Sequence, residues 1–275
     1  MTPPKIFREQ RNSELNMATF GEPKLPRWLT AILMFMISLM LLIISIFNNL
    51  VGTLYYFLTI MICLLLWLFV DMQQPESLGF RFSKRWWLGL VIGLALGGGV
   101  MGMIVVLELV VGWVSLTVAY TAEQGMLVVG MLAVYVIWQG LVAFAEELVG
   151  RGYIQQNLNT KLTAILAVMC SAIMFTALHL PSIIEQSIPL PLSTIMVLNI
   201  TFGGLMLGWA FVKTQTLWLP IGIHFGWNFI QYHIAGLGYL SQGIYTAQNL
   251  GWEVITGSRD LKRFSSREIE LIIGS

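Results

Sequence analysis

Long apolar runs separated by short polar segments dominate the chain. Residues 28–70 contain no Asp, Glu, Lys, Arg or His, which is enough for two membrane-spanning helices of about 20 residues each, joined near Asn48 and Asn49. Further runs of spanning length cover roughly residues 86–113, 126–157, 162–180, 192–212 and 219–235. The run from residue 126 predicts a helix longer than the bilayer is thick. The pattern therefore predicts seven clear transmembrane helices.

Glycines recur along two of these predicted helices at a spacing that suits close helix contacts. The third span has glycines at positions 89, 93 and 97–99, and Gly222 and Gly226 lie four residues apart in the seventh. Small residues at this spacing let helix backbones approach each other within a membrane. We therefore expect both sets to mark helix packing.

The composition agrees with an integral membrane protein. Hydrophobic residues make up 57% of the chain and charged residues 11%, against roughly 25% charged residues in soluble domains. The formal net charge of +1 argues against a nucleic-acid partner. Cys63 and Cys170 both lie in apolar runs, so no disulfide framework is expected. The predicted fold class is all-α, a polytopic membrane helical bundle.

Lys and Arg in the short loops predict the orientation of the bundle. The first 27 residues lack a signal peptide and are expected to form a polar cytosolic leader. The basic loop at residues 81–85 and the turns with Lys161 and Lys213 would lie on the same side. Seven spans would then place the basic tail on the opposite side. We therefore expect an eighth span or a re-entrant segment within residues 236–257, which gives about eight transmembrane helices.

Few ionisable side chains lie within the predicted spans. A charged group at a helix centre costs at least ~2.5–3.5 kcal/mol, so such groups tend to face a polar cavity and mark function. Glu108 is expected to reach the far interface, and His233, which belongs to no motif, is expected to be a packing residue. The remaining members of the set are Glu146, Glu147, Arg151, His179 and His224.

The segment FAEELVGRGY, residues 144–153, holds three of these groups. On a helix, Glu147 and Arg151 stand four residues apart and can form an ion pair. Glu146 points about 100° away, and Gly150, one turn after it, leaves space for a water or a substrate backbone. The pattern predicts a structural ion pair beside a free carboxylate, Glu146, that can act as a general base.

Two later helices carry histidines with a partner one turn away. Phe175 precedes His179 in FTALH, and His224 precedes Asn228 in HFGWN. Counting ~1.5 Å per residue from the cytosolic turns places these groups and Glu146 at scattered depths within the membrane. We expect the bundle to surround a polar intramembrane cavity in which they meet.

In these motifs the chain resembles the CPBP family of CaaX proteases and bacteriocin-processing enzymes, also called Abi proteins, which includes the type II CaaX prenyl endopeptidase. The resemblance rests on EELVGR, FTALH and HFGWN in family order and extends over roughly residues 78–236. It implies an intramembrane endopeptidase with an all-helical core. The implied organisation has four segments: a leader at 1–27, two transmembrane helices at 28–77, the catalytic core at 78–236 and a C-terminal segment at 237–275 with the eighth helix and a polar tail.

The resemblance also implies roles for the motif residues. Glu146, helped by His179, would activate the hydrolytic water. His224 and Asn228 would stabilise the oxyanion of the tetrahedral intermediate. The residues that would support the site are Glu147, Arg151 and Phe175.

A metal ion is the main chemical alternative. Glu146, His179 and His224 could ligate zinc with water in the fourth position, and the family is often labelled as metalloprotease. The chain has no HExxH motif, however, and Asn228 offers an amide, a poor zinc ligand, where such a motif has a histidine. We expect a metal-independent mechanism without a required cofactor.

The same residues are compatible with two other functions. The acidic and imidazole groups could form the proton relay of a proton-coupled transporter, although the chain lacks the internal repeat that many transporters show. A non-catalytic immunity or scaffold protein of the same family would bind a membrane peptide. The leading hypothesis is the endopeptidase, with the lipid bilayer and a membrane-associated substrate, prenylated or not, as partners. We expect it in the plasma membrane of a prokaryote, and the sequence leaves its oligomeric state open.

Overall fold

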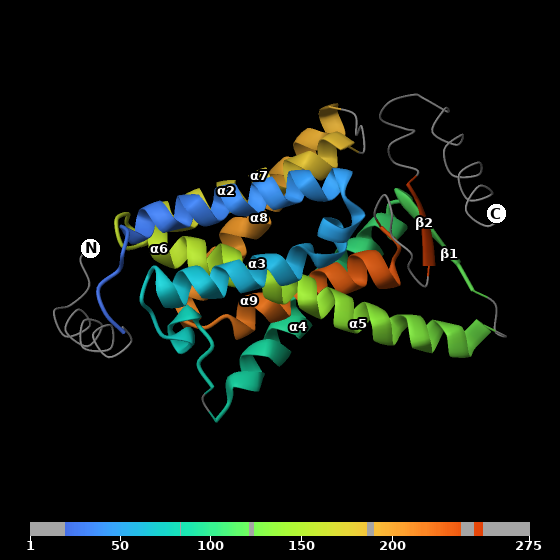
Figure 1. Ribbon diagram of the computed structural model, residues 1–275. Coiled ribbons are helices and arrows are strands. Elements are labelled where there is room, and N and C mark those ends of the chain that lie inside the picture. The colour runs from blue at the N-terminus through green and yellow to red at the C-terminus, as the bar shows by residue number, and fades with distance from the viewer. Residues whose placement is uncertain (1–19, 83, 121–123, 186–189, 238–244, 250–275) are drawn as a thin grey trace. The chain divides into compact units, whose positions relative to one another are not determined.

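The computed structural model describes residues 20–82, 84–120, 124–185, 190–237 and 245–249. Among these residues, six helices have the length and apolar composition needed to cross a membrane. They are Arg27–Phe47 (α2), Asn49–Phe69 (α3), Trp86–Val110 (α4), Gly125–Leu158 (α5 with its continuation), Ala164–Glu185 (α7) and Leu190–Thr214 (α8), as Figure 1 shows. The protein is thus an integral, multi-pass membrane protein, and the predicted all-α bundle is confirmed.

The last part of the described chain differs from the prediction. The expected seventh helix is present as α9 (Trp218–Asn228), which runs directly into a π-helical segment, η4 (Phe229–Ile234). The prediction of an eighth helix is wrong for Tyr245–Asn249, which forms strand β2, antiparallel to β1 (Val114–Val118). β1 has the sequence VSLTV, whose β-branched residues favour an extended chain. The other residues of that predicted span beyond residue 237 lie outside the described chain.

The chain divides into two compact units. The first comprises residues 1–97 and 137–226, and the second comprises residues 98–136 and 227–275. Every residue predicted for the site lies in the first unit except Asn228, which is counted with the second.

A π-helix lies at the centre of the first unit. α5 (Gly125–Glu147) passes without a break into η3 (Leu148–Gln155) and then α6 (Gln156–Leu158), which confirms the long continuous helix. All the residues of η3 are buried, and the segment packs against α2, α3, α7 and α8. π-helical turns are rare and occur frequently at functional sites. The wider turn begins directly after Glu147.

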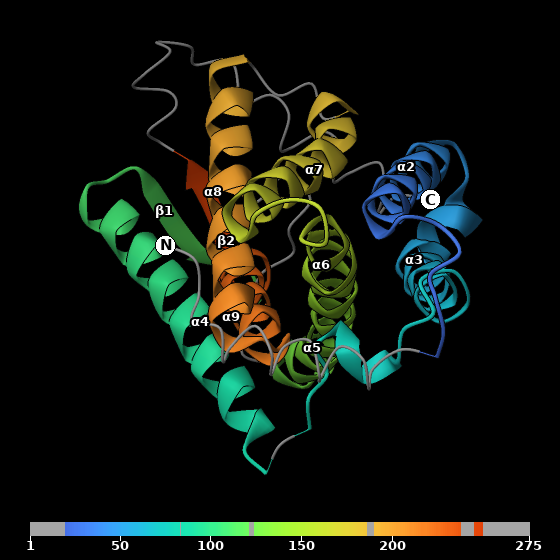
Figure 2. The same cartoon turned by 90° about the vertical axis from the view of Figure 1, so that its left-hand side faces the viewer.

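The helices α2 and α3 form a hairpin that packs on this long helix. Figure 2 shows the two helices side by side, and Asn48 between them accepts a hydrogen bond from the backbone N–H of Val51 at 3.2 Å. Asp71, just after α3, accepts hydrogen bonds from Thr30 of α2 at 2.8 Å and from Asn157 of α6 at 2.9 Å. All three of these side chains are fully buried. Since an unpaired buried polar group is costly, this network fixes the position of the hairpin on the helix that carries Glu146 and Glu147.

Glycines hold α9 against α4, in keeping with the packing role expected of them, although the sequence did not predict which helices they would join. A Cβ atom at Gly97 would overlap the backbone carbonyl of Ile223, and one at Gly222 would overlap the backbone carbonyl oxygen of Leu90. Only glycine permits this approach, so the contact fixes the position of His224, which lies two residues after Gly222.

Within the second unit, His233 is packed rather than hydrogen-bonded. Its ring stacks on Tyr135 with the ring centres 4.2 Å apart and the planes inclined by 17°. Neither of its ring nitrogens has a hydrogen-bond partner within the described chain. This agrees with the packing role expected of it. Glu108 lies two residues before the end of α4 and is partly buried.

Candidate active site

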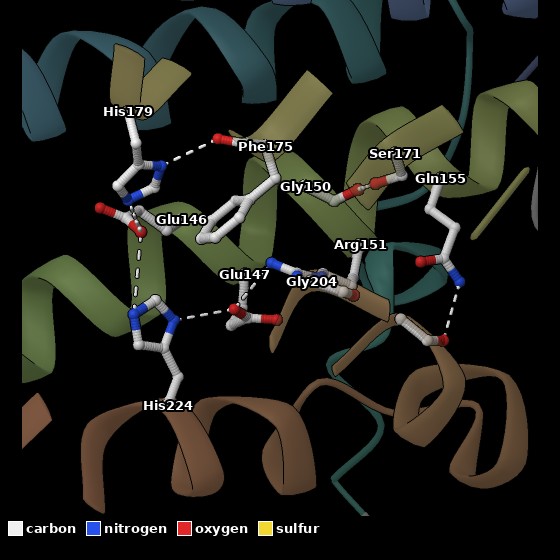
Figure 3. Close-up of polar contacts among 11 residues, drawn as sticks. Glu146, Glu147, Gly150, Arg151, Gln155, Ser171, Phe175, His179, Gly204 and His224 are labelled. Carbon is white, nitrogen blue, oxygen red and sulfur yellow. Dashed lines mark hydrogen bonds and ion pairs between the residues drawn. The ribbon is translucent and has the colours of Figure 1, made fainter. Parts of the chain in front are cut away.

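The two glutamates and two histidines predicted for the site come from three separate helices and point towards one another, as Figure 3 shows. Glu146 and Glu147 are the last residues of α5, and Arg151 lies in η3. His179 lies near the C-terminal end of α7, and His224 lies in α9. The long helix therefore presents the carboxylates, and two other helices present the imidazoles.

Glu147 is fully buried and binds two positively polarised groups. Its Oε1 atom accepts hydrogen bonds from Nη1 of Arg151 at 2.9 Å and from Nδ1 of His224 at 2.8 Å. Arg151 also donates from Nη2 to the carbonyl oxygen of Gly204 in α8 at 3.1 Å. Its guanidinium carbon lies 4.5 Å from the centre of the Phe175 ring. The predicted Glu147–Arg151 pair is therefore present, and it joins α7, α8 and α9 to the long helix.

Glu146 has a different environment from its neighbour. Its side chain is 20% exposed, whereas that of Glu147 is 0% exposed. Its Oε2 atom lies 3.9 Å from Nε2 of His179 and 3.7 Å from Nε2 of His224. These separations exceed a direct hydrogen bond, and polar groups at such distances are often bridged by water. The structure thus brings Glu146, His179 and His224 together around one point.

Hydrogen bonds at the Nδ1 atoms fix the ring orientation of both histidines. Nδ1 of His179 lies 2.8 Å from the carbonyl oxygen of Phe175. A carbonyl oxygen only accepts, so Nδ1 carries a proton, and Nε2 of the neutral ring is left as an acceptor facing Glu146. Nδ1 of His224 donates in the same way to Glu147, and its Nε2 also faces Glu146.

Asn228 is the last residue of α9, one helical turn after His224. It is counted with the second unit, and its part in the site stays a prediction.

A cavity of ≈190 Å³ opens beside Glu146. Gly150 and His179 also line it, and a Cβ atom at Gly150 would meet only the ring of Phe175, at an ordinary contact distance of 3.9 Å. The space predicted beside Glu146 is therefore present. The α2–α3 hairpin contributes the lining residues Ser38, Leu42, Tyr55, Tyr56 and Thr59.

One contact of the candidate base was not predicted from the sequence. The hydroxyl group of Tyr56 in α3 donates a hydrogen bond to Oε1 of Glu146 at 3.3 Å. The sequence carried a weak signal, because Tyr55 and Tyr56 place two phenol groups in the middle of an otherwise apolar span. Nothing in the local pattern indicated which other helix they would meet.

A zinc site would need at least three protein ligands among the described residues. No three His, Cys, Asp or Glu side chains among them are grouped closely enough to hold a metal ion. Nδ1 of His179 and Nδ1 of His224 are engaged with protein acceptors, so Nε2 is the ring nitrogen that each histidine presents to Glu146. The metal-independent mechanism stays a prediction.

Comparisons with known proteins agree with the motifs. A family model described as type II CAAX prenyl endopeptidase Rce1-like matches residues 125–230. This range contains both carboxylates, Arg151 and the two histidines of the site, but it leaves out the α2–α3 hairpin. No curated protein and no solved structure shows a significant match to the chain. Residues 125–230 of the chain are therefore similar to the Rce1-like type II CAAX prenyl endopeptidases, the relationship that its three motifs predict.

Proposed function

We propose that the protein is an intramembrane endopeptidase that hydrolyses a peptide bond of a membrane-associated protein or peptide. The match of residues 125–230 to a family of prenyl endopeptidases supports peptide hydrolysis in general, without naming the substrate. The observation that carries the proposal is the approach of Glu146 Oε2 to the Nε2 atoms of His179 and His224, at 3.9 and 3.7 Å, beside a cavity. A carboxylate and two imidazoles in this arrangement suit acid–base catalysis by an activated water.

The hydrolytic water would bind between Glu146 and His179. Both Oε2 of Glu146 and Nε2 of the neutral His179 are acceptors, so a single water can donate one proton to each of them. The oxygen lone pair of the water is then free to attack the scissile carbonyl carbon. Glu146 takes a proton as the new carbon–oxygen bond forms, and it returns that proton to the leaving nitrogen when the peptide bond breaks.

His224 and Asn228 would stabilise the oxyanion. In its protonated form His224 donates from Nδ1 to Glu147 and presents a second N–H at Nε2, on the side of Glu146. The amide of Asn228, one turn later on the same helix, is the second donor that the family resemblance implies. Donors that are fixed before the reaction stabilise developing negative charge at little reorganisation cost.

Glu147 and Arg151 would support the site instead of taking part in proton transfer. Glu147 is inaccessible to solvent, and its Oε1 atom is occupied by Arg151 and His224. The pair sets the direction of the His224 ring, and Phe175 covers the guanidinium group of Arg151.

The substrate would be a membrane-associated peptide or protein, including one with a prenylated CaaX-type C-terminus. We further propose that the N-terminus and the basic loops face the cytosol and that the protein resides in the plasma membrane of a prokaryote. We propose no required cofactor, because the groups described above account for each proton transfer.

The proposal is tested by comparing membrane peptides from cells that express wild-type protein or Glu146→Gln, by mass spectrometry. Glu108→Gln is the matched control, because it removes an intramembrane carboxylate outside the site. We expect at least one cleavage product to be present with wild type and Glu108→Gln and absent with Glu146→Gln at equal protein level. Identical peptide profiles for all three proteins would contradict the proposal, and gradient-driven uptake by the wild type would then favour a transporter.

A further inference from the structure

The two oxygens of the Glu146 carboxylate have different partners. Oε1 accepts a hydrogen bond from the Tyr56 hydroxyl group, whereas Oε2 faces the imidazoles of His179 and His224. The last torsion of a glutamate side chain has a broad, two-fold distribution, so the side chain itself does not fix the plane of its carboxylate. An external donor on one oxygen does fix it.

The ring of Tyr56 is itself held in place. It makes edge-to-face contacts with Tyr55, at 5.1 Å between ring centres, and with Trp138, at 5.6 Å. The helix that carries it is anchored by Asp71, through the buried hydrogen bonds to α2 and α6. Edge-to-face ring pairs and a satisfied buried network both restrict the position of the phenol.

Tyr56 lies outside residues 125–230, the part of the chain that matches the family. The α2–α3 hairpin therefore completes the first unit's cavity and contributes a hydrogen bond to the candidate general base. The known family segment alone does not contain this donor.

We propose that Tyr56 is a positioning residue for the reaction, an inference that rests on the proposed function. Its hydroxyl group holds Oε1 of Glu146, so that Oε2 is the atom presented to the hydrolytic water. The O···O distance of 3.3 Å is longer than an ideal O–H···O hydrogen bond, and catalytic hydrogen bonds are often long until substrate binds. Tyr56 makes no bond to substrate in this scheme, so its removal acts on the chemical step.

The test is the kinetics of full-length Tyr56→Phe in liposomes, which retains the ring and removes only the hydroxyl group. The probe is the membrane peptide whose cleavage depends on Glu146 in the comparison above. We expect kcat per folded protein to fall about 10- to 100-fold, the range for loss of a hydrogen bond to a charged group, with KM changed less than about threefold. Folded protein is quantified from the thermal unfolding transition of each variant.

Two other tyrosine variants separate positioning from a general loss of polarity. Tyr135→Phe removes a phenol from α5 in the second unit and is expected to keep the wild-type kcat. Tyr55→Phe removes a phenol from the same cavity wall and is expected to change KM rather than kcat, because the structure shows no hydrogen bond from it to Glu146 among the described contacts.

The outcomes distinguish this inference from the proposed function. If wild type cleaves the peptide and Tyr56→Phe retains its kcat, or changes only KM, the positioning role is wrong and the endopeptidase stands. An equal loss of kcat in Tyr135→Phe would also overturn the positioning role. If wild type cleaves no peptide, the proposed function fails and this inference fails with it.

Discussion

Glu146 and Glu147 are neighbours in the sequence, but the residues one turn after them differ. Arg151 follows Glu147 and neutralises it in a fully buried position, while Gly150 follows Glu146 and leaves a cavity beside it. The exposed fractions of the two carboxylates, 20% and 0%, reflect that difference. Two adjacent residues thus supply both the candidate general base and one member of a buried ion pair.

The buried ion pair makes a prediction about stability. Arg151→Met leaves the Glu147 carboxylate buried without its guanidinium, and breaking such a pair typically costs about 3–5 kcal/mol. We expect a lower unfolding midpoint and a lower folded yield in detergent, measured by thermal unfolding. Lys161→Met, at an exposed turn, is the control and should resemble wild type.

A double variant tests whether the unpaired Glu147 charge causes the loss of stability in Arg151→Met. Glu147→Gln combined with Arg151→Met removes the buried charge altogether, so it should be more stable than Arg151→Met alone. If Arg151→Met is as stable as Lys161→Met, the pair does not support the site in the way described here.

At the residue scale, local spacing predicted what lies within one helix and missed what joins distant helices. The i, i+4 relation was sufficient to find the Glu147–Arg151 pair and the space at Gly150. The hydrogen bond from Tyr56 to Glu146 joins residues 90 positions apart, and no local pattern encodes such a contact. The bond from Arg151 to the Gly204 carbonyl escaped prediction for the same reason.

At the scale of elements, α9 is positioned by backbone contact with α4. Gly97 and Gly222 allow this contact because neither has a side chain. The second histidine of the site is carried on α9, so the geometry at Glu146 depends on glycines that take no part in the chemistry.

Two alanine substitutions on α4 test this dependence. Gly97→Ala places a methyl group where the Ile223 carbonyl lies, whereas a Cβ atom at Gly99 meets nothing within 4 Å. Overpacking typically costs about 1–3 kcal/mol, so Gly97→Ala should lower the unfolding temperature in detergent. Gly99→Ala should be neutral or slightly stabilising, because alanine favours a helix over glycine. Equal unfolding temperatures for both variants would show that the α4–α9 contact is looser than described.

The elements themselves were predictable where their apolar runs were long. The helices α2 and α3 together run from Arg27 to Phe69, within one residue of the expected 28–70 at each end, with the break at Asn48. The π-helical turn of η3 was not predicted, because its apolar pattern does not differ from that of an α-helix. The strand β2 was not predicted either, because its pairing with β1 brings together segments far apart in the chain.

At the scale of the whole molecule, the candidate site includes residues that lie outside the segment that matches the family. The match covers residues 125–230, while the cavity is lined in part by the α2–α3 hairpin. The predicted division of the chain, with a catalytic core at 78–236, leaves the hairpin outside the core and stays a prediction. Within the first unit, the hairpin lines the cavity and donates a hydrogen bond to Glu146.

The central claim is that Glu146 activates the water that hydrolyses the substrate. It is tested most directly by the cleavage rate of the Glu146-dependent peptide with purified proteins in liposomes, with and without a strong chelator. We predict that Glu146→Gln cleaves at least about 100-fold more slowly than wild type, as expected for loss of a general base. Glu108→Gln should cleave at the wild-type rate, and chelation should leave that rate unchanged. A folded Glu146→Gln protein that cleaves at the full wild-type rate would contradict the account.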